Sequence, residues 1–89
     1  MSQLSSNHFA SVAAAVFVAF EDYAGVTVAA ASVLAEVASD PTLWTVYWEL
    51  EQELEIDFDD DETDRMRTVA DLIALCADKV GAAKMAEAV

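Results

Sequence analysis

The sequence predicts an all-α protein, and three properties of its composition support that class. Hydrophobic residues make up 56% of the 89 residues, and many of them are alanine, the strongest helix former. Glycine occurs twice and proline once, which is too little turn chemistry for a sandwich or barrel of many short strands. The length suits one domain with a modest core. We therefore expect a single domain, residues 1–89, folded as a small bundle of three to four helices.

Acidic side chains dominate the charged residues. Seventeen Asp and Glu residues against four Lys and Arg residues give a formal net charge of -13. Such a charge repels the phosphates of nucleic acids and of anionic lipid head groups, and it favours encounter with basic protein surfaces. We expect a partner with a basic surface, no nucleic acid and no membrane. A solvating surface suited to high salt is the alternative explanation of the acidity.

The first helix is expected over residues 8–24, because residues 5–7 (Ser-Ser-Asn) offer an N-cap and Gly25 offers a C-terminal stop. Its apolar residues recur at helical spacing, and they are Phe9, Val12, Val16, Phe17, Phe20 and Tyr23. The apolar run is shorter than the roughly 20 residues that span a bilayer. It also lacks the basic start of a signal peptide, so we expect a cytoplasmic protein.

The second helix is expected to begin at Pro41, with Asp40 as its N-cap, after a loop and a short helical turn over residues 26–38. Its inward face is formed by Leu43, Val46, Tyr47, Leu50 and Leu54. Acidic and apolar residues alternate over residues 49–59, which by period alone could indicate a strand. The continuous helical stripe favours a helix to about Leu54, followed by an extended turn.

The rest of the chain predicts one further long helix. Residues 57–64 are too charged to pack and indicate a loop or a single helical turn. Thr68 with Asp71 three residues later resembles a capping box, so a helix is expected over residues 69–80. Its inward stripe consists of Val69, Leu72, Ile73, Cys76 and Val80. The tail after Gly81 either extends this helix or frays.

Three short segments mark the helix ends: Gly25-Val26 after the first helix, Glu55-Ile56-Asp57 after the second, and Arg67-Thr68-Val69-Ala70-Asp71-Leu72 at the opening of the last. Together with the layout of residues 39–80, they resemble an acyl or peptidyl carrier protein, most closely its C-terminal half. The resemblance implies a helical bundle of acyl-carrier-protein type. It also implies a place in fatty acid or polyketide biosynthesis or a similar acyl-transfer system, where partner enzymes do the chemistry.

The chain departs from this family at the attachment site. Carrier proteins have an Asp-Ser-Leu motif whose serine holds a 4'-phosphopantetheine arm. When the second helix is laid on the family pattern without gaps from Leu50, Asp40 takes the place of the serine and Pro41 that of the leucine. The serine is displaced to Ser39. We therefore expect a degenerate carrier that acts by recognition, and the alternative is a working carrier with phosphopantetheine on Ser39.

The resemblance also marks the second helix as the recognition helix. Its exposed positions map onto Trp44, Trp48 and Glu51, with Asp40 at its start, so these four residues are the expected partner-binding residues. Tryptophan is enriched at interaction hot spots. Alternatively, the first loop folds over both tryptophans and they belong to the core. A third hypothesis is an unrelated acidic protein whose first helix and tryptophan pair form a homodimer.

Intrinsic catalysis is not expected. His8 is the single histidine, and the single Cys76 sits in an apolar stripe, which predicts a buried small hydrophobe. Asp57, Asp59 and Asp61 have the first spacings of a calcium loop, but Glu62 stands where glycine is needed and Thr68 where the bidentate glutamate is needed. The other carboxylates should stay ionised on a solvated surface, which is unsuitable for general acid catalysis. The sequence predicts neither a metal site nor an enzyme.

Overall fold

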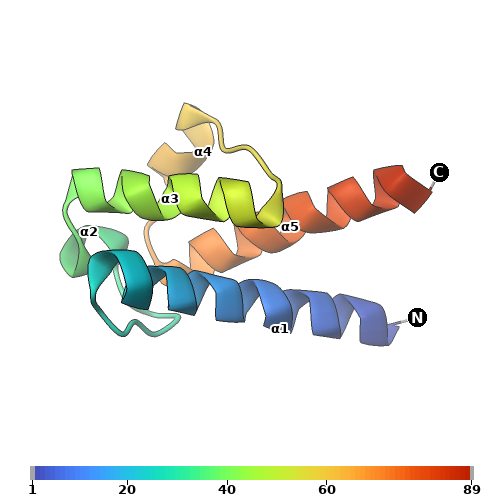
Figure 1. Cartoon of the computed structure of the whole chain (residues 1–89), viewed down its shortest axis with the longest axis horizontal. Coiled ribbons are helices and arrows are strands. Elements are labelled where there is room, and N and C mark those ends of the chain that lie inside the picture. The colour runs from blue at the N-terminus through green and yellow to red at the C-terminus, as the bar shows by residue number, and fades with distance from the viewer. Residues whose placement is uncertain (1, 89) are drawn as a thin grey trace.

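Three long helices lie alongside one another in the computed structural model, which describes residues 2–88 and the side chains of residues 9–82 (Figure 1). They are α1 (Ser2–Ala19), α3 (Asp40–Leu54) and α5 (Val69–Ala88). Two short helices, α2 (Leu34–Val37) and α4 (Asp60–Arg65), lie in the connections, and no strand occurs over residues 2–88. The N-terminal end of α1 and the C-terminal end of α5 lie at the same end of the molecule (Figure 1). The all-α class is confirmed.

The first helix begins earlier and ends differently than predicted. It starts at Ser2, so residues 5–7 lie inside α1 and do not cap it. Serine or asparagine inside a helix costs only about 0.5 kcal/mol relative to alanine. These residues are therefore common N-caps, but a helix can also run through them. After Ala19 the chain widens into a π-helical turn, η1 (Phe20–Ala24). Gly25 ends this turn with φ 69, which confirms the predicted stop.

The two ends of the predicted apolar stripe on the first helix are exposed. Phe9 and Tyr23 are 51% and 47% exposed, whereas Val12, Val16 and Phe20 between them are buried. A π turn has more residues per turn than an α-helix, so Tyr23 no longer aligns with Phe20 three residues earlier. Among the described side chains of α1, Phe9 precedes the first buried one, Val12. The stripe therefore contributes a shorter core face than its sequence spacing suggests.

Helix α3 begins one residue earlier than predicted. Ser39 is the N-cap and Asp40 the first helical residue, so Asp40 is not the cap. Proline fits either of the first two positions, because the amides of the first turn have no partner within the helix. The helix ends at Leu54, and Glu55 follows with φ 57 in the left-handed region. The preference for a helix over a strand is thereby confirmed.

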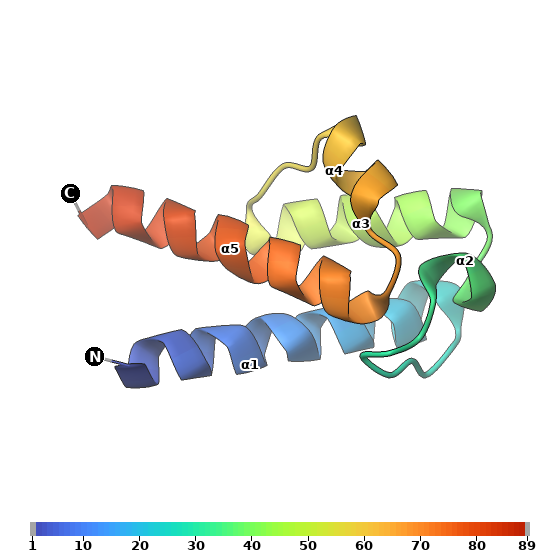
Figure 2. The same cartoon turned by 180° about the vertical axis from the view of Figure 1, so that it is seen from behind.

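The loop that follows Gly25 is fastened to the start of α5. Val33 and Thr68 form an isolated antiparallel bridge. On either side of it, the Leu34 amide donates to the Arg67 carbonyl and the Val69 amide donates to the Ser32 carbonyl, both at 2.9 Å. Figure 2 shows this loop running beside the start of α5 before it enters α2. The predicted loop and short helical turn are confirmed, and their route leads away from the outer face of α3.

Helices α4 and α5 begin with capping boxes. In α4 the Asp59 amide donates to Glu62 at 2.9 Å, as one half of a reciprocal pair. In α5 the Asp71 amide donates to the Thr68 hydroxyl at 3.2 Å and the Thr68 amide donates back to Asp71 at 3.1 Å, as the sequence predicted. A salt bridge of 2.8 Å between Lys79 and Glu62 joins the two helices. Helix α5 continues past Gly81 to Ala88.

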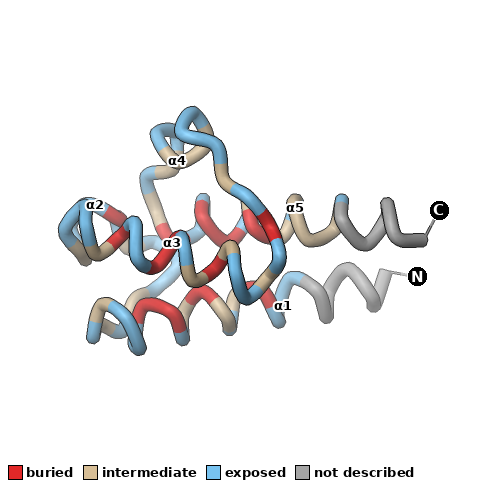
Figure 3. The backbone as a smooth tube through the Cα atoms, turned by 45° about the horizontal axis from the view of Figure 1, so that its top comes forward, coloured by how far each residue is buried: buried red, intermediate tan, exposed pale blue. Residues whose placement is uncertain are grey.

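One cluster of buried residues lies where α1, α3 and α5 meet (Figure 3). Its members are Val12, Val16, Ala19, Phe20, Leu34, Leu43, Val46, Tyr47, Leu50, Ile56, Val69, Leu72, Ile73 and Cys76. The predicted inward positions of α3 and α5 belong to it, except that Leu54 and Val80 are half-buried at its edge. Cys76 is fully buried among these residues, as expected, and burial raises the pKa of its thiol to about 12.

Candidate functional site: the outer face of α3

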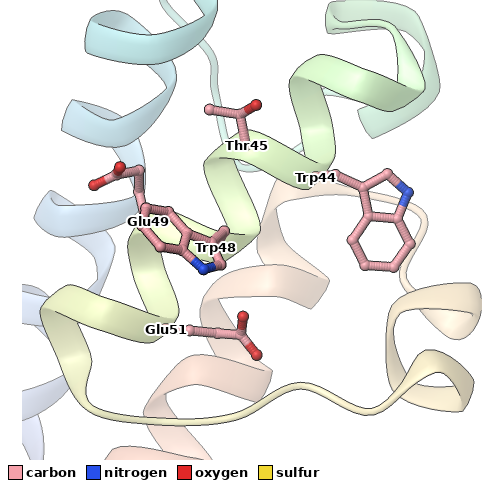
Figure 4. Close-up of a pocket in the computed structure, with 5 residues that line it drawn as sticks. All are labelled: Trp44, Thr45, Trp48, Glu49 and Glu51. Atoms are coloured by element: carbon pink, nitrogen blue, oxygen red, sulfur yellow. The ribbon is translucent and has the colours of Figure 1, made fainter.

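Trp44 and Trp48 stand on the outer face of α3, opposite the residues that enter the core. Their side chains are 53% and 56% exposed, and they lie one helical turn apart. Figure 4 shows both indoles projecting from the helix. The alternative in which the first loop covers them is wrong, because that loop is held against α5. The tryptophans belong to the surface of the described structure.

The two tryptophans border a shallow hollow. It is lined by Trp44, Thr45, Trp48, Glu49 and Glu51, all from α3 (Figure 4). The Trp44 ring meets the buried Tyr47 ring edge to face, with centroids 5.9 Å apart, and Tyr47 meets Phe58 in the same way at 6.0 Å. These contacts limit the orientations open to Trp44 while much of its indole stays exposed. The hollow therefore combines a partly anchored aromatic wall with two carboxylates.

Glu49 connects the hollow to the π turn at the end of α1. Its carboxylate lies beside the Tyr23 phenol and raises the pKa of Tyr23, chiefly by favouring the protonated phenol as a hydrogen-bond donor. The negative charge of Glu49 adds to the shift, because an anion nearby disfavours the phenolate. The contact gives the exposed Tyr23 a partner on α3. It also places the Glu49 carboxylate at one edge of the hollow.

Glu51 has a structural contact in addition to its place in the hollow. Its Oε2 accepts the Phe58 amide at 2.8 Å, which ties the segment after α3 back onto the helix. Among the described residues, no hydrogen bond is assigned to Oε1. Sequence reasoning placed Glu51 on the recognition face but missed this contact. The contact depends on the left-handed turn at Glu55, which no glycine or asparagine in the sequence signals.

Replacing Glu51 tests its structural role, which is to accept the Phe58 amide. Glu51→Ala leaves the part-buried Phe58 amide without its acceptor, which should cost about 1–3 kcal/mol of the free energy of unfolding. Glu51→Gln keeps an oxygen that can accept from Phe58, so its loss should stay below about 1 kcal/mol. Urea denaturation followed by circular dichroism measures both. Equal losses for the two variants would contradict a structural hydrogen bond.

The four predicted partner-binding residues share one stripe of α3. Asp40, Trp44, Trp48 and Glu51 are spaced by four, four and three residues, which places them along one face. Asp40 is exposed at the first position of the helix. The sequence analysis missed Glu49, which lines the hollow with Trp44, Trp48 and Glu51. Glu49 lies one turn after Thr45, to one side of the stripe that the sequence marked.

Ser39, the expected attachment residue of the carrier alternative, lies at the N-cap of α3. It is exposed, and its hydroxyl donates to the Thr42 hydroxyl at 3.1 Å. No hydrogen bond from the Ser39 side chain to the helix amides is present. Ser39 therefore stands at the end of the same helix that carries the tryptophans, but it is outside the lining of the hollow.

This face offers groups that can bind a ligand. Indole rings and carboxylates can hold a cationic or apolar group. Within residues 9–82, no three His, Cys, Asp or Glu side chains are placed to hold a metal ion. In the described part of the chain, no helix has the length and apolar character to cross a membrane.

Comparison with known proteins gives no relative. The sequence matches no protein-family model, and it has no match among the curated proteins or the solved structures.

Proposed function

We propose that this protein is an acyl-carrier-like adaptor that binds the basic surface of a partner through the outer face of α3. The observation that carries the proposal is the exposed pair Trp44 and Trp48, flanked by carboxylates. In this proposal the protein has no catalytic residue and no prosthetic group. The partner belongs to an acyl-transfer or biosynthetic system.

The energetic argument begins with the water-exposed indole surface. About half of each tryptophan is exposed, and burying that half against a partner would contribute about 2–3 kcal/mol per side chain. Tryptophan is also the residue type most often found at the centre of binding interfaces. The contact between Trp44 and Tyr47 keeps one indole partly ordered before binding, which lowers the entropic cost of association.

Charge favours a basic partner over a second copy of this chain. A two-fold homodimer through this face would bring the same surface together from two molecules that each carry -13. Asp40, Glu49 and Glu51 would then face like charges across the interface, which is unfavourable. A basic surface would be attracted from a distance and could cover the indoles. The homodimer hypothesis is therefore the weaker one for this face.

The acyl-transfer context is supported by the resemblance and by the order of the helices. A long helix, a long loop, a second long helix, a short helix and a capped last helix follow one another in the order that the resemblance implies. The adaptor role is favoured over the carrier role because Asp40 and Pro41 occupy the first turn of α3, where a carrier has its serine and leucine.

Affinity capture from cells of the source organism tests the adaptor role. The wild-type chain should retain acyl-transfer enzymes with basic surfaces, and a chain with both Trp44→Ala and Trp48→Ala should not. With the purified partner, each substitution should weaken binding about 30-fold, since a hot spot contributes about 2 kcal/mol or more. The variants should keep the wild-type circular dichroism spectrum. Undiminished binding by the double variant would contradict recognition through this face.

The working-carrier alternative rests on the exposure of Ser39 at the start of a 15-residue helix. Co-expression with a broad-range phosphopantetheinyl transferase, followed by intact mass measurement, tests it directly. A mass gain of one phosphopantetheine that disappears in Ser39→Ala would establish the carrier. An unchanged wild-type mass would rule it out under those conditions.

A further inference from the structure

We propose that the hollow on α3 receives an arginine side chain of the partner, stacked on the Trp48 indole and bound by Glu51. The proposal rests on the proposed function, because it takes the partner to be a protein with a basic surface. It goes further by naming arginine as the side chain that the hollow recognises, and by assigning the preference for arginine over lysine to Trp48 and Glu51.

The first step is the chemistry of the lining. Two indoles, two carboxylates and one hydroxyl surround the hollow, and none of the five lining residues is basic. The face of an indole attracts a cation through its quadrupole, more strongly than other aromatic rings do. A cation in this position would also be within the field of Glu49 and Glu51. The hollow is therefore complementary to a positive side chain that has a flat or apolar surface.

The second step is the order of the groups along α3. Glu51 follows Trp48 by three residues, so its carboxylate lies one turn along the same face (Figure 4). The Phe58 amide occupies Oε2 of Glu51, and among the described residues Oε1 has no assigned partner. A group stacked on the Trp48 ring could donate to Oε1 without breaking the contact with Phe58. The site would then be used without a change in the fold.

The third step decides between arginine and lysine. A guanidinium is planar and weakly hydrated, so it can stack on an indole while its five N–H groups still donate in the ring plane. The ammonium of lysine is compact and strongly hydrated, and it gains less over a ring that remains half exposed to water. The geometry favours arginine.

The fourth step is preorganisation. Glu51 is held by the Phe58 amide, and Trp44 rests against Tyr47. Two of the side chains around the hollow are thus restrained by contacts inside the protein. Binding that does not have to order its own site loses less conformational entropy. This restraint favours the recognition of one side chain over diffuse attraction to the whole acidic surface.

Two probe peptides test the proposal on the full chain. Six arginines and six lysines, both with blocked ends, carry the same charge, and calorimetry at low salt measures their dissociation constants. The arginine peptide should bind roughly three-fold more tightly, which is the size expected for an exposed cation–π contact. Trp48→Leu keeps an apolar side chain without a ring, and it should bring the ratio of the two constants close to one.

A matched pair of charge changes tests the role of Glu51. Glu51→Gln and Asp78→Asn each remove one negative charge, and Asp78 is exposed on α5 outside the hollow. The first should weaken binding of the arginine peptide about three-fold or more, and the second by less than about two-fold. Equal effects of the two changes would overturn the proposal, because binding would then follow total charge alone.

Two further outcomes would also overturn it. Equal affinities of the wild-type chain for both peptides would exclude selection of arginine, and so would a preference that survives Trp48→Leu. In either case the adaptor role would stand if capture of a basic partner still depended on both tryptophans. The opposite result is also distinguishable. If capture of a partner did not depend on the two tryptophans, but the preference for the arginine peptide did depend on Trp48, the proposed function would fail and the arginine site would remain.

Discussion

Replacing Phe20 by alanine should destabilise the protein more than any substitution on its surface. Phe20 is fully buried at the junction of α1 and η1, and its carbonyl accepts the Gly25 amide that closes the π turn. Removing a buried phenylalanine costs about 3–5 kcal/mol through lost burial and the cavity left behind. A domain of this size has a total stability of about 4–13 kcal/mol. Thermal denaturation should show a fall in Tm of about 15 °C or more.

Phe9→Ala is the matched control, because it makes the same chemical change on the same helix. Phe9 is about half exposed, so its loss should change the free energy of unfolding by less than about 0.5 kcal/mol. A loss as large as that of Phe20→Ala would contradict this burial pattern. If that loss also grew on dilution, it would point to a homodimer that covers Phe9, since dimers lose stability as concentration falls.

The inward residues of α3 and α5 could be predicted because the information is local. Leu43, Val46 and Leu50 follow helical spacing, and burial in the structure follows the same spacing. The start of α5 was also readable, because Thr68 and Asp71 form their cap within three residues of each other. Signals of this kind depend on neighbours in the chain and require no knowledge of the tertiary fold.

Features that depend on tertiary contacts were not predictable from the sequence. The π turn at the end of α1 has no residue signature, yet it decides that Tyr23 faces outward and meets Glu49. The hydrogen bond from Phe58 to Glu51 spans seven residues and needs a left-handed residue at Glu55. The route of the first loop depends on its bridge to Thr68.

The candidate site was partly predictable for a physical reason. The sequence placed Trp44 and Trp48 off the core stripe, but it could not say whether another segment covers them. That question was decided by the contacts of residues 32–34 with the start of α5, more than 30 positions further along the chain. Sequence spacing thus predicted which face the tryptophans occupy, and the tertiary structure determined that this face is open.

Introducing the carrier attachment motif should convert this protein into a substrate of a phosphopantetheinyl transferase, if the proposed resemblance extends to the start of α3. The triple variant Ser39→Asp, Asp40→Ser and Pro41→Leu places the family's Asp-Ser-Leu at the start of α3. The new hydroxyl at position 40 would lie beside amides of the first turn that have no helical partner and that favour an incoming phosphate. Asp40 is exposed in the structure, so the enzyme would have access to this position.

Intact mass after co-expression should show one added phosphopantetheine on most molecules of the triple variant and none on the wild type. The matched control carries Ser39→Asp and Pro41→Leu but keeps Asp40, so it has no hydroxyl at the attachment position and should stay unmodified. Circular dichroism would show whether each variant keeps its helices. A folded triple variant that stays unmodified would mean that the resemblance of α3 to a carrier helix does not extend to the surface the transferase reads. A modified one would support the proposal that Asp40 and Pro41 are what separates this protein from a working carrier.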